Sequence, residues 1–70
     1  MQSELTWHIP VVDGLSRERE LLVTVSEGRV VLLPPPGEGF SLTLSAISRL
    51  GEALRAAAFE SATADMRMAT

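Results

Sequence analysis

Residues 20–33, which read ELLVTVSEGRVVLL, decide the fold. The two outer parts of this stretch, residues 20–26 and 29–33, are rich in the β-branched side chains that favour strands. They flank Glu27-Gly28, and glycine tolerates the positive φ that a tight turn between two strands demands. The stretch therefore predicts an antiparallel hairpin with a two-residue turn.

The length of this turn decides which hairpin side chains share a face. With two turn residues, one face carries Leu21, Val23, Val25, Val30 and Leu32, and the other carries Leu22, Thr24, Val31 and Leu33. A three-residue turn is the alternative, and it would move Val31 and Leu33 to the core face, because a slip of one residue reverses every side chain. We favour the two-residue turn.

Two other segments, residues 5–12 and 40–44, alternate apolar and polar side chains with the period of a half-buried strand. Pro10 removes one backbone donor, so the first of these strands should lie at an edge or break at this residue. Residues 34–39 contain three prolines and two glycines, which favour a loop rather than a strand.

A helix is expected from about Ala46 to Glu60, with Ser45 as its N-cap. Its buried stripe should contain Ile47, Leu50, Leu54 and either Ala57 or Ala58. Residues 61–70 lose this stripe and are expected to fray into a flexible tail. Residues 1–60 then form a single α+β domain, in which one C-terminal helix packs on one face of a three- to four-stranded antiparallel sheet.

A chain of this size is expected to gain stability by associating with another protein chain. A 70-residue domain buries only about 60% of the surface that its unfolded chain exposes. There is no cysteine, and a lone histidine cannot build a metal site, so neither disulfides nor a metal or other cofactor is expected. We therefore expect a homodimer, a complex with a larger protein, or both.

The expected contact surface lies on the sheet face away from the helix. That face is mostly polar, but Leu22, Val31 and Leu33 should lie together on it, and exposed apolar clusters often mark partner surfaces. Arginine is favoured at interfaces, and we expect Arg17, Arg19 and Arg29 to line the rim of this cluster.

Charge and hydropathy argue against several other functions. The net charge of −3 disfavours direct binding to nucleic acid phosphates. No apolar run approaches the ~20 residues that cross a bilayer, and the acidic start is unlike a signal peptide, so a cytoplasmic protein without membrane contact is expected.

No residues form a recognisable catalytic or cofactor site. On an alternating strand Trp7 and His8 point to opposite faces, which favours an unpaired surface histidine over a ligand or base. No serine lies in a nucleophile motif, and the carboxylates show no acid–base spacing. We expect a protein that is not an enzyme and has no small-molecule substrate.

The segment from Val30 to Ala57 resembles the small actinobacterial regulatory proteins of the BldB type. The resemblance rests on Leu42-Thr43-Leu44-Ser45 followed by a capped amphipathic helix, and the arginine-only, alanine-rich composition agrees with a GC-rich source. The early helical tryptophan and the charged strand–loop motif of that family are missing here. The resemblance implies a dimeric regulatory accessory protein encoded beside a helix-turn-helix regulator.

The expected function is therefore a small dimeric protein-interaction module, an accessory to a transcriptional regulator. A structural or assembly subunit of a larger complex is the alternative, and a direct DNA-binding protein fits the charge least well.

Overall fold

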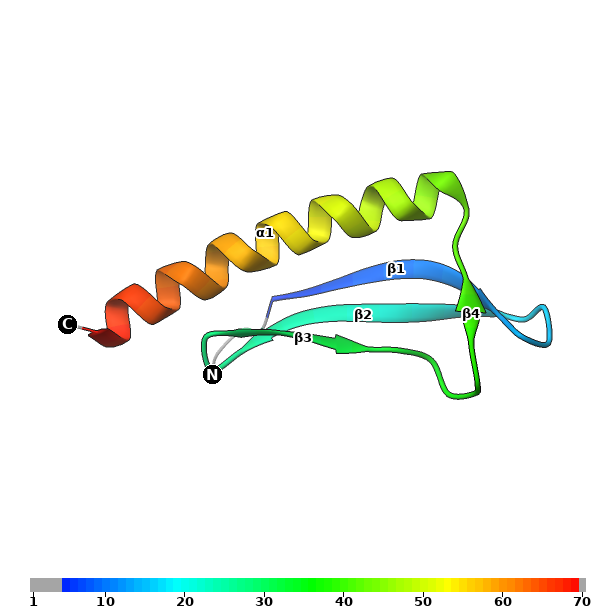
Figure 1. Ribbon diagram of the computed structural model, residues 1–70, viewed down its shortest axis with the longest axis horizontal. Helices are drawn as coiled ribbons and strands as arrows, with labels where there is room; N and C mark the ends of the chain where they lie inside the picture. Colours follow the sequence, from blue (N-terminus) through cyan, green and yellow to red (C-terminus); the bar gives the residue numbers. More distant parts are fainter. Residues whose placement is uncertain (1–4, 70) are drawn as a thin grey trace.

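The computed structural model describes the backbone of residues 5–69 and the side chains of residues 5–63. It contains four strands followed by one helix: β1 (Thr6–Asp13), β2 (Glu18–Ser26), β3 (Arg29–Leu33), β4 (Phe40–Ser41) and α1 (Leu44–Ala69). The strands form one antiparallel sheet in the order β3-β2-β1-β4, and α1 lies along one face of it (Figure 1). This confirms the α+β class and the arrangement expected from the sequence.

The β2–β3 hairpin has the two-residue turn that the sequence favoured. Ser26 faces Arg29 and Leu22 faces Leu33, with every pair between them in the expected register. Glu27 and Gly28 both have positive φ, 55° and 75°, as a type I′ turn requires. The twist of this turn matches that of the strands, which explains why so short a connection is stable.

Pro10 lies on an unpaired edge although β1 is not the last strand in the sheet. β4 pairs only with Val12 and Asp13, so the outer edge of β1 has no strand beside it at Pro10. We expected this strand to lie at an edge of the sheet or to break at Pro10. It does neither, because it is continuous and has a strand on each side, but its outer side is unpaired at this residue. The fourth strand is shorter than expected, because Leu44 belongs to α1 and is 85% exposed rather than part of the core.

The core lies between the sheet and a stripe of small side chains on α1. From the sheet it contains the buried residues Ile9, Val11, Leu21 and Val23, and from the helix Ala46, Ala53 and Ala57. Trp7, Val25, Val30, Leu42 and Leu50 are partly buried against this cluster.

The buried stripe of the helix shares Leu50 and Ala57 with the expected one and differs in its other members. Ile47 and Leu54, which we expected to be buried, are 51% and 36% exposed, whereas Ala53 and Ala57 are at most 3% exposed. Ala46, Leu50, Ala53, Ala57 and Ser61 recur at the spacing of one helix face. The small side chains let the helix backbone approach the sheet closely, and the larger ones remain on its flank.

Both ends of the helix also differ from the expectation. The hydroxyl of Thr43, not of Ser45, accepts a hydrogen bond from the Ala46 amide at 3.1 Å, so Thr43 is the N-cap. Instead of ending near Glu60, α1 continues to Ala69. The buried hydroxyl of Ser61 donates to the carbonyl of Gly28 in the hairpin turn, and the helix then continues past this end of the sheet (Figure 1).

Candidate protein-interaction surface

One face of the sheet is bare. Figure 1 shows α1 on one side and, among the described residues, no helix or strand packed on the other. On this open face Leu33 lies directly across from Leu22, and Val31 lies across from Thr24. Leu22 and Val31 are partly exposed and Leu33 is 47% exposed. These three residues form one apolar cluster, as the sequence predicted, and we call it the hairpin patch.

A polar pair, His8 and Glu20, borders the hairpin patch at one end. Nδ1 of His8 lies 3.0 Å from Oε1 of Glu20, and both side chains are more than half exposed. His8 is the cross-strand neighbour of Leu22, and Glu20 precedes Leu22 on the same face of β2. The expectation of an unpaired surface histidine was therefore wrong, because β1 and β2 bring a carboxylate to it.

Only one of the three arginines expected at the rim lies beside the patch. Arg29 is two residues from Val31 on β3, so both side chains are on the open face. Arg17 and Arg19 lie instead at the β1–β2 turn, where they approach the carboxylate of Asp13. Their Nε atoms are 2.9 Å and 3.6 Å from its Oδ2. These two arginines hold a turn together and do not border the patch.

Asp13 organises this turn through its buried side chain. Its Oδ1 accepts hydrogen bonds from the amides of Leu15 and Arg17, both at 2.9 Å. The bond from the Arg17 amide is the largest cause that holds the pKa of Asp13 below its ordinary value of 3.8, and burial opposes it. The Leu15 amide and the Arg17 guanidinium lower the pKa of Asp13 further. Both carboxylate oxygens thus accept hydrogen bonds within the turn, and the side chain of Asp13 is a structural anchor for it.

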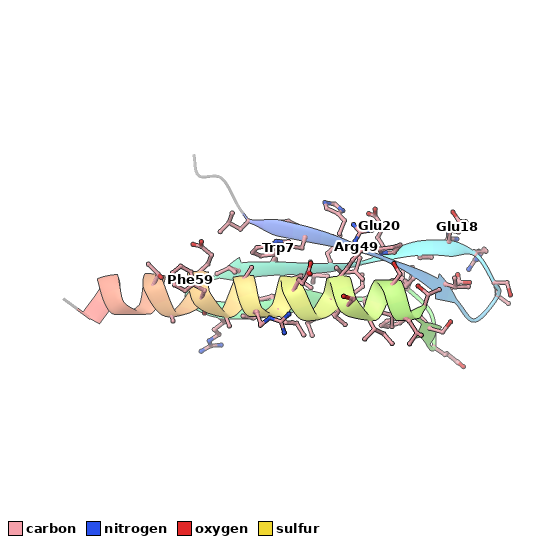
Figure 2. All side chains as sticks on the ribbon, turned by 90° about the horizontal axis from the view of Figure 1, so that it is seen from above. Trp7, Glu18, Glu20, Arg49 and Phe59 are labelled. Carbon is pink, nitrogen blue, oxygen red and sulfur yellow. The ribbon has the colours of Figure 1, made fainter. Side chains whose placement is uncertain are left out.

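Arg49 identifies which flank of α1 faces β1. Its Nη2 donates to the carbonyl oxygen of His8 at 3.4 Å. Arg49 and Trp7 also line a shallow hollow of about 520 Å³ between α1 and β1. Figure 2 shows both side chains on the same side of the helix.

The opposite flank of α1 is apolar and faces β3. At 3.6 residues per turn, Ile47 and Leu54 lie about 140–160° around the helix from Arg49, which places them on the β3 side. On β3 itself Leu32 points to the helix face of the sheet and is 50% exposed. Leu32, Ile47 and Leu54 therefore make a second exposed apolar surface, which we call the seam flank. Sequence reasoning missed it, because it assigned all three side chains to the core.

Two further features were looked for in residues 5–63, a metal site and a membrane-spanning helix. In this range no three histidine or acidic side chains gather as metal ligands would. None of the helical segments in this range is apolar over a length sufficient to span a bilayer.

No family model matches this chain. Searches of curated proteins and of solved structures also found no similar protein.

Proposed function

We propose that this chain is a small, non-enzymatic protein-interaction module that works as a dimer and binds a further protein through the hairpin patch. The observation that carries the proposal is the bare face of a single-layer sheet, on which Leu22, Val31 and Leu33 remain uncovered. Fully burying one such side chain contributes about 1.5–3 kcal/mol. Because all three are already at least half-buried, covering their exposed parts contributes about 1–3.5 kcal/mol per copy. This is a substantial share of the stability of a domain of this length, about 3.5–10 kcal/mol.

The surroundings of the patch suit a protein better than a nucleic acid. Protein interfaces combine an apolar centre with a polar or charged rim. Here Glu20 and His8 border one end, Arg29 borders the other, and Glu18 adds another carboxylate to the same face. A phosphate backbone would meet these carboxylates, and a net charge of −3 further opposes it.

The resemblance of residues 30–57 to small regulatory proteins suggests the class of partner to test first. A transcriptional regulator in the cytoplasm is the partner that we propose. A structural subunit of a larger complex would use the same patch, but it would require its host in order to fold.

Site-specific photocrosslinking in cells tests the proposal. A benzophenone amino acid replaces Leu33 in one variant and Leu15 in a control, because Leu15 is an exposed leucine, 73% accessible, at the distant β1–β2 turn. We expect a discrete adduct with a heterologous protein from position 33 and none from position 15. The protein captured in this adduct, purified on its own, should then bind the wild-type chain. The Leu22→Asp variant should bind it about 10- to 100-fold more weakly.

Equal adducts from both positions, or unchanged affinity for the Leu22→Asp variant, would remove the hairpin patch as the binding surface. A chain that is unfolded until the captured protein is added would instead identify a subunit of a larger complex. Circular dichroism of the purified chain alone distinguishes this case.

A further inference from the structure

The two edges of the sheet are protected to different degrees. An exposed strand edge is a template for pairing with another chain, and proteins commonly block such edges with proline, charge or a covering segment. The β1 edge has all three: Pro10 has no amide to donate, Arg49 binds the His8 carbonyl, and β4 pairs with the end of the strand. The β3 edge, residues 29–33, has no proline within it, and no described strand pairs with it on that side.

The turn defines which backbone groups of β3 point outward. In a type I′ turn the residues on either side of the two central positions are hydrogen bonded, which here means Ser26 and Arg29. Antiparallel pairs alternate between bonded and non-bonded, so residues 29, 31 and 33 direct their amides and carbonyls towards β2. Val30 and Leu32 therefore direct theirs away from the sheet. The same alternation continued across β2 turns the His8 carbonyl outward, in agreement with its hydrogen bond to Arg49.

We propose that β3 pairs antiparallel with β3 of a second copy about a two-fold axis at Val31. This inference rests on the proposed function and names the edge that forms the dimer. In this register Val30 lies opposite Leu32 of the second copy, and each such pair exchanges two hydrogen bonds, which gives four in total. A register centred on Leu32 would place Val30 opposite Pro34 of the second copy, which has no donor. A register centred on Val30 leaves the outward groups of Leu32 opposite the turn.

The pairing also gives the seam flank a place to be buried. Because α1 contacts β1, β2 and β3, its axis runs over the middle of these strands. The two β2 strands of the dimer are three strand spacings apart, about 14 Å, and the helices above them have the same separation. Because a helix with its side chains is about 10–12 Å across, the facing side chains of the two helices are then only about 2–4 Å apart across the gap. Ile47 and Leu54 point into this gap from both copies, above the paired Val30 and Leu32 side chains.

On the other face the two hairpin patches become one surface. Val31 lies next to Val31 of the second copy, so six apolar side chains are contiguous across the axis. Charge is also complementary. Arg29 and Glu20 of the second copy are about 12 Å apart between Cα atoms, which two long side chains can bridge. The further protein of the proposed function would therefore meet a doubled, two-fold-symmetric patch.

Disulfide crosslinking tests the register, because the chain has no cysteine of its own. The Val31→Cys variant places two thiols across a non-hydrogen-bonded pair, where Cα atoms are about 4.5 Å apart, within the range that a disulfide spans. We expect mild oxidation to convert it to a covalent dimer. Arg29→Cys and Leu33→Cys are matched controls on the same strand. Both should remain monomers with free thiols, since each cysteine lies about 14 Å from the same cysteine of the second copy.

Sedimentation equilibrium then tests the two contacts separately. Proline at position 32 removes an outward amide and leaves the pairing with β2 intact, so Leu32→Pro should weaken the dimer at least tenfold more than Leu32→Ala. On the helix, Ile47→Glu should weaken the dimer at least tenfold, whereas Ser48→Glu, on the exposed side away from the seam, should not. Circular dichroism confirms that each variant is folded.

The possible outcomes separate this inference from the proposed function. A monomer at several hundred micromolar, or a dimer that crosslinks through Leu33→Cys instead of Val31→Cys, overturns pairing through β3. In that case the proposed binding of a further protein stands if the Leu22→Asp variant still loses its affinity for that protein. Conversely, a dimer that crosslinks at position 31 supports the inference even if Leu22→Asp leaves binding of the other protein unchanged.

Discussion

Leucine at position 57 should destabilise the protein strongly, whereas leucine at position 58 should not. Ala57 is fully buried between α1 and the sheet, and Ala58, one residue further along the same helix, is exposed. Alanine and leucine have similar helix propensities, so the comparison isolates packing. The two variants also have the same composition, which makes each the control of the other.

The size of the effect follows from the close packing at position 57. The Ala57→Leu change inserts three carbon atoms where the side chain has no exposed surface. Overpacking of this kind costs about 1–3 kcal/mol. For a domain of this length each kcal/mol lowers Tm by about 4–8 °C, so a cost of about 2 kcal/mol lowers it by about 8–16 °C. Ala58→Leu should change the free energy of unfolding by less than about 0.5 kcal/mol.

Thermal unfolding followed by circular dichroism measures both variants. The wild type and the two variants are compared at one protein concentration, because association makes Tm depend on concentration. A large loss of stability for Ala58→Leu with none for Ala57→Leu would refute the packing described here. It would mean that the helix is turned by about 70°, with Ile47 and Leu54 against the sheet, as the sequence pattern alone suggested.

Two further predictions concern the helix cap and the first turn. Thr43→Ala should lower the free energy of unfolding by about 1 kcal/mol in urea titrations, whereas Ser45→Ala should have little effect, because only Thr43 caps the helix; equal losses would contradict this assignment. For Asp13 the pKa is lower in the folded protein than its ordinary value of 3.8, so its stabilising effect is full above that pH and is lost as the pH falls through the folded pKa. Between pH 2 and 6, Tm should therefore fall less steeply with acid in Asp13→Asn than in the wild type or in the exposed control Glu38→Gln. If Asp13→Asn has the same pH profile as the wild type, the carboxylate of Asp13 does not stabilise the turn.

The parts of the fold that depend on neighbouring residues could be predicted from the sequence. The hairpin register follows from Glu27-Gly28, because the backbone conformation of two turn residues sets every pair beyond them. The unpaired outer side of β1 at Pro10 agrees with its missing donor, although the strand is neither the last in the sheet nor broken there. Both properties are local, and tertiary packing did not alter them.

The face of the helix could not be predicted in the same way. Hydrophobicity favours Ile47, Leu50 and Leu54 as the buried stripe, and a stripe of alanines lies about 70° away from it around the helix. Which one faces the sheet depends on how closely the helix approaches, a property of the assembled layers. The length of α1 has a similar cause, because Ser61 gains its partner only when the hairpin turn is in place.

The charges around the candidate surface depended on tertiary pairing as well. The sequence placed Arg17, Arg19 and Arg29 together, but β1 supplies Asp13 to two of them and leaves the third near the patch. The partner of His8 was also missed, because the connection between β1 and β2 is longer than two residues, and the turn at Asp13-Gly14 did not by itself set the register between the two strands.

The overhang of α1 determines where an attached segment would be held. After Ser61 the helix continues for eight residues to Ala69, which carries its end about 12 Å past the hairpin turn. A fluorophore or fusion joined there would stand clear of both the open sheet face and the β3 edge. In an antiparallel pair of copies the C-terminal ends of the two helices would point in opposite directions. Energy transfer between two fluorophores attached there would report on association, and the labels would not touch either contact surface.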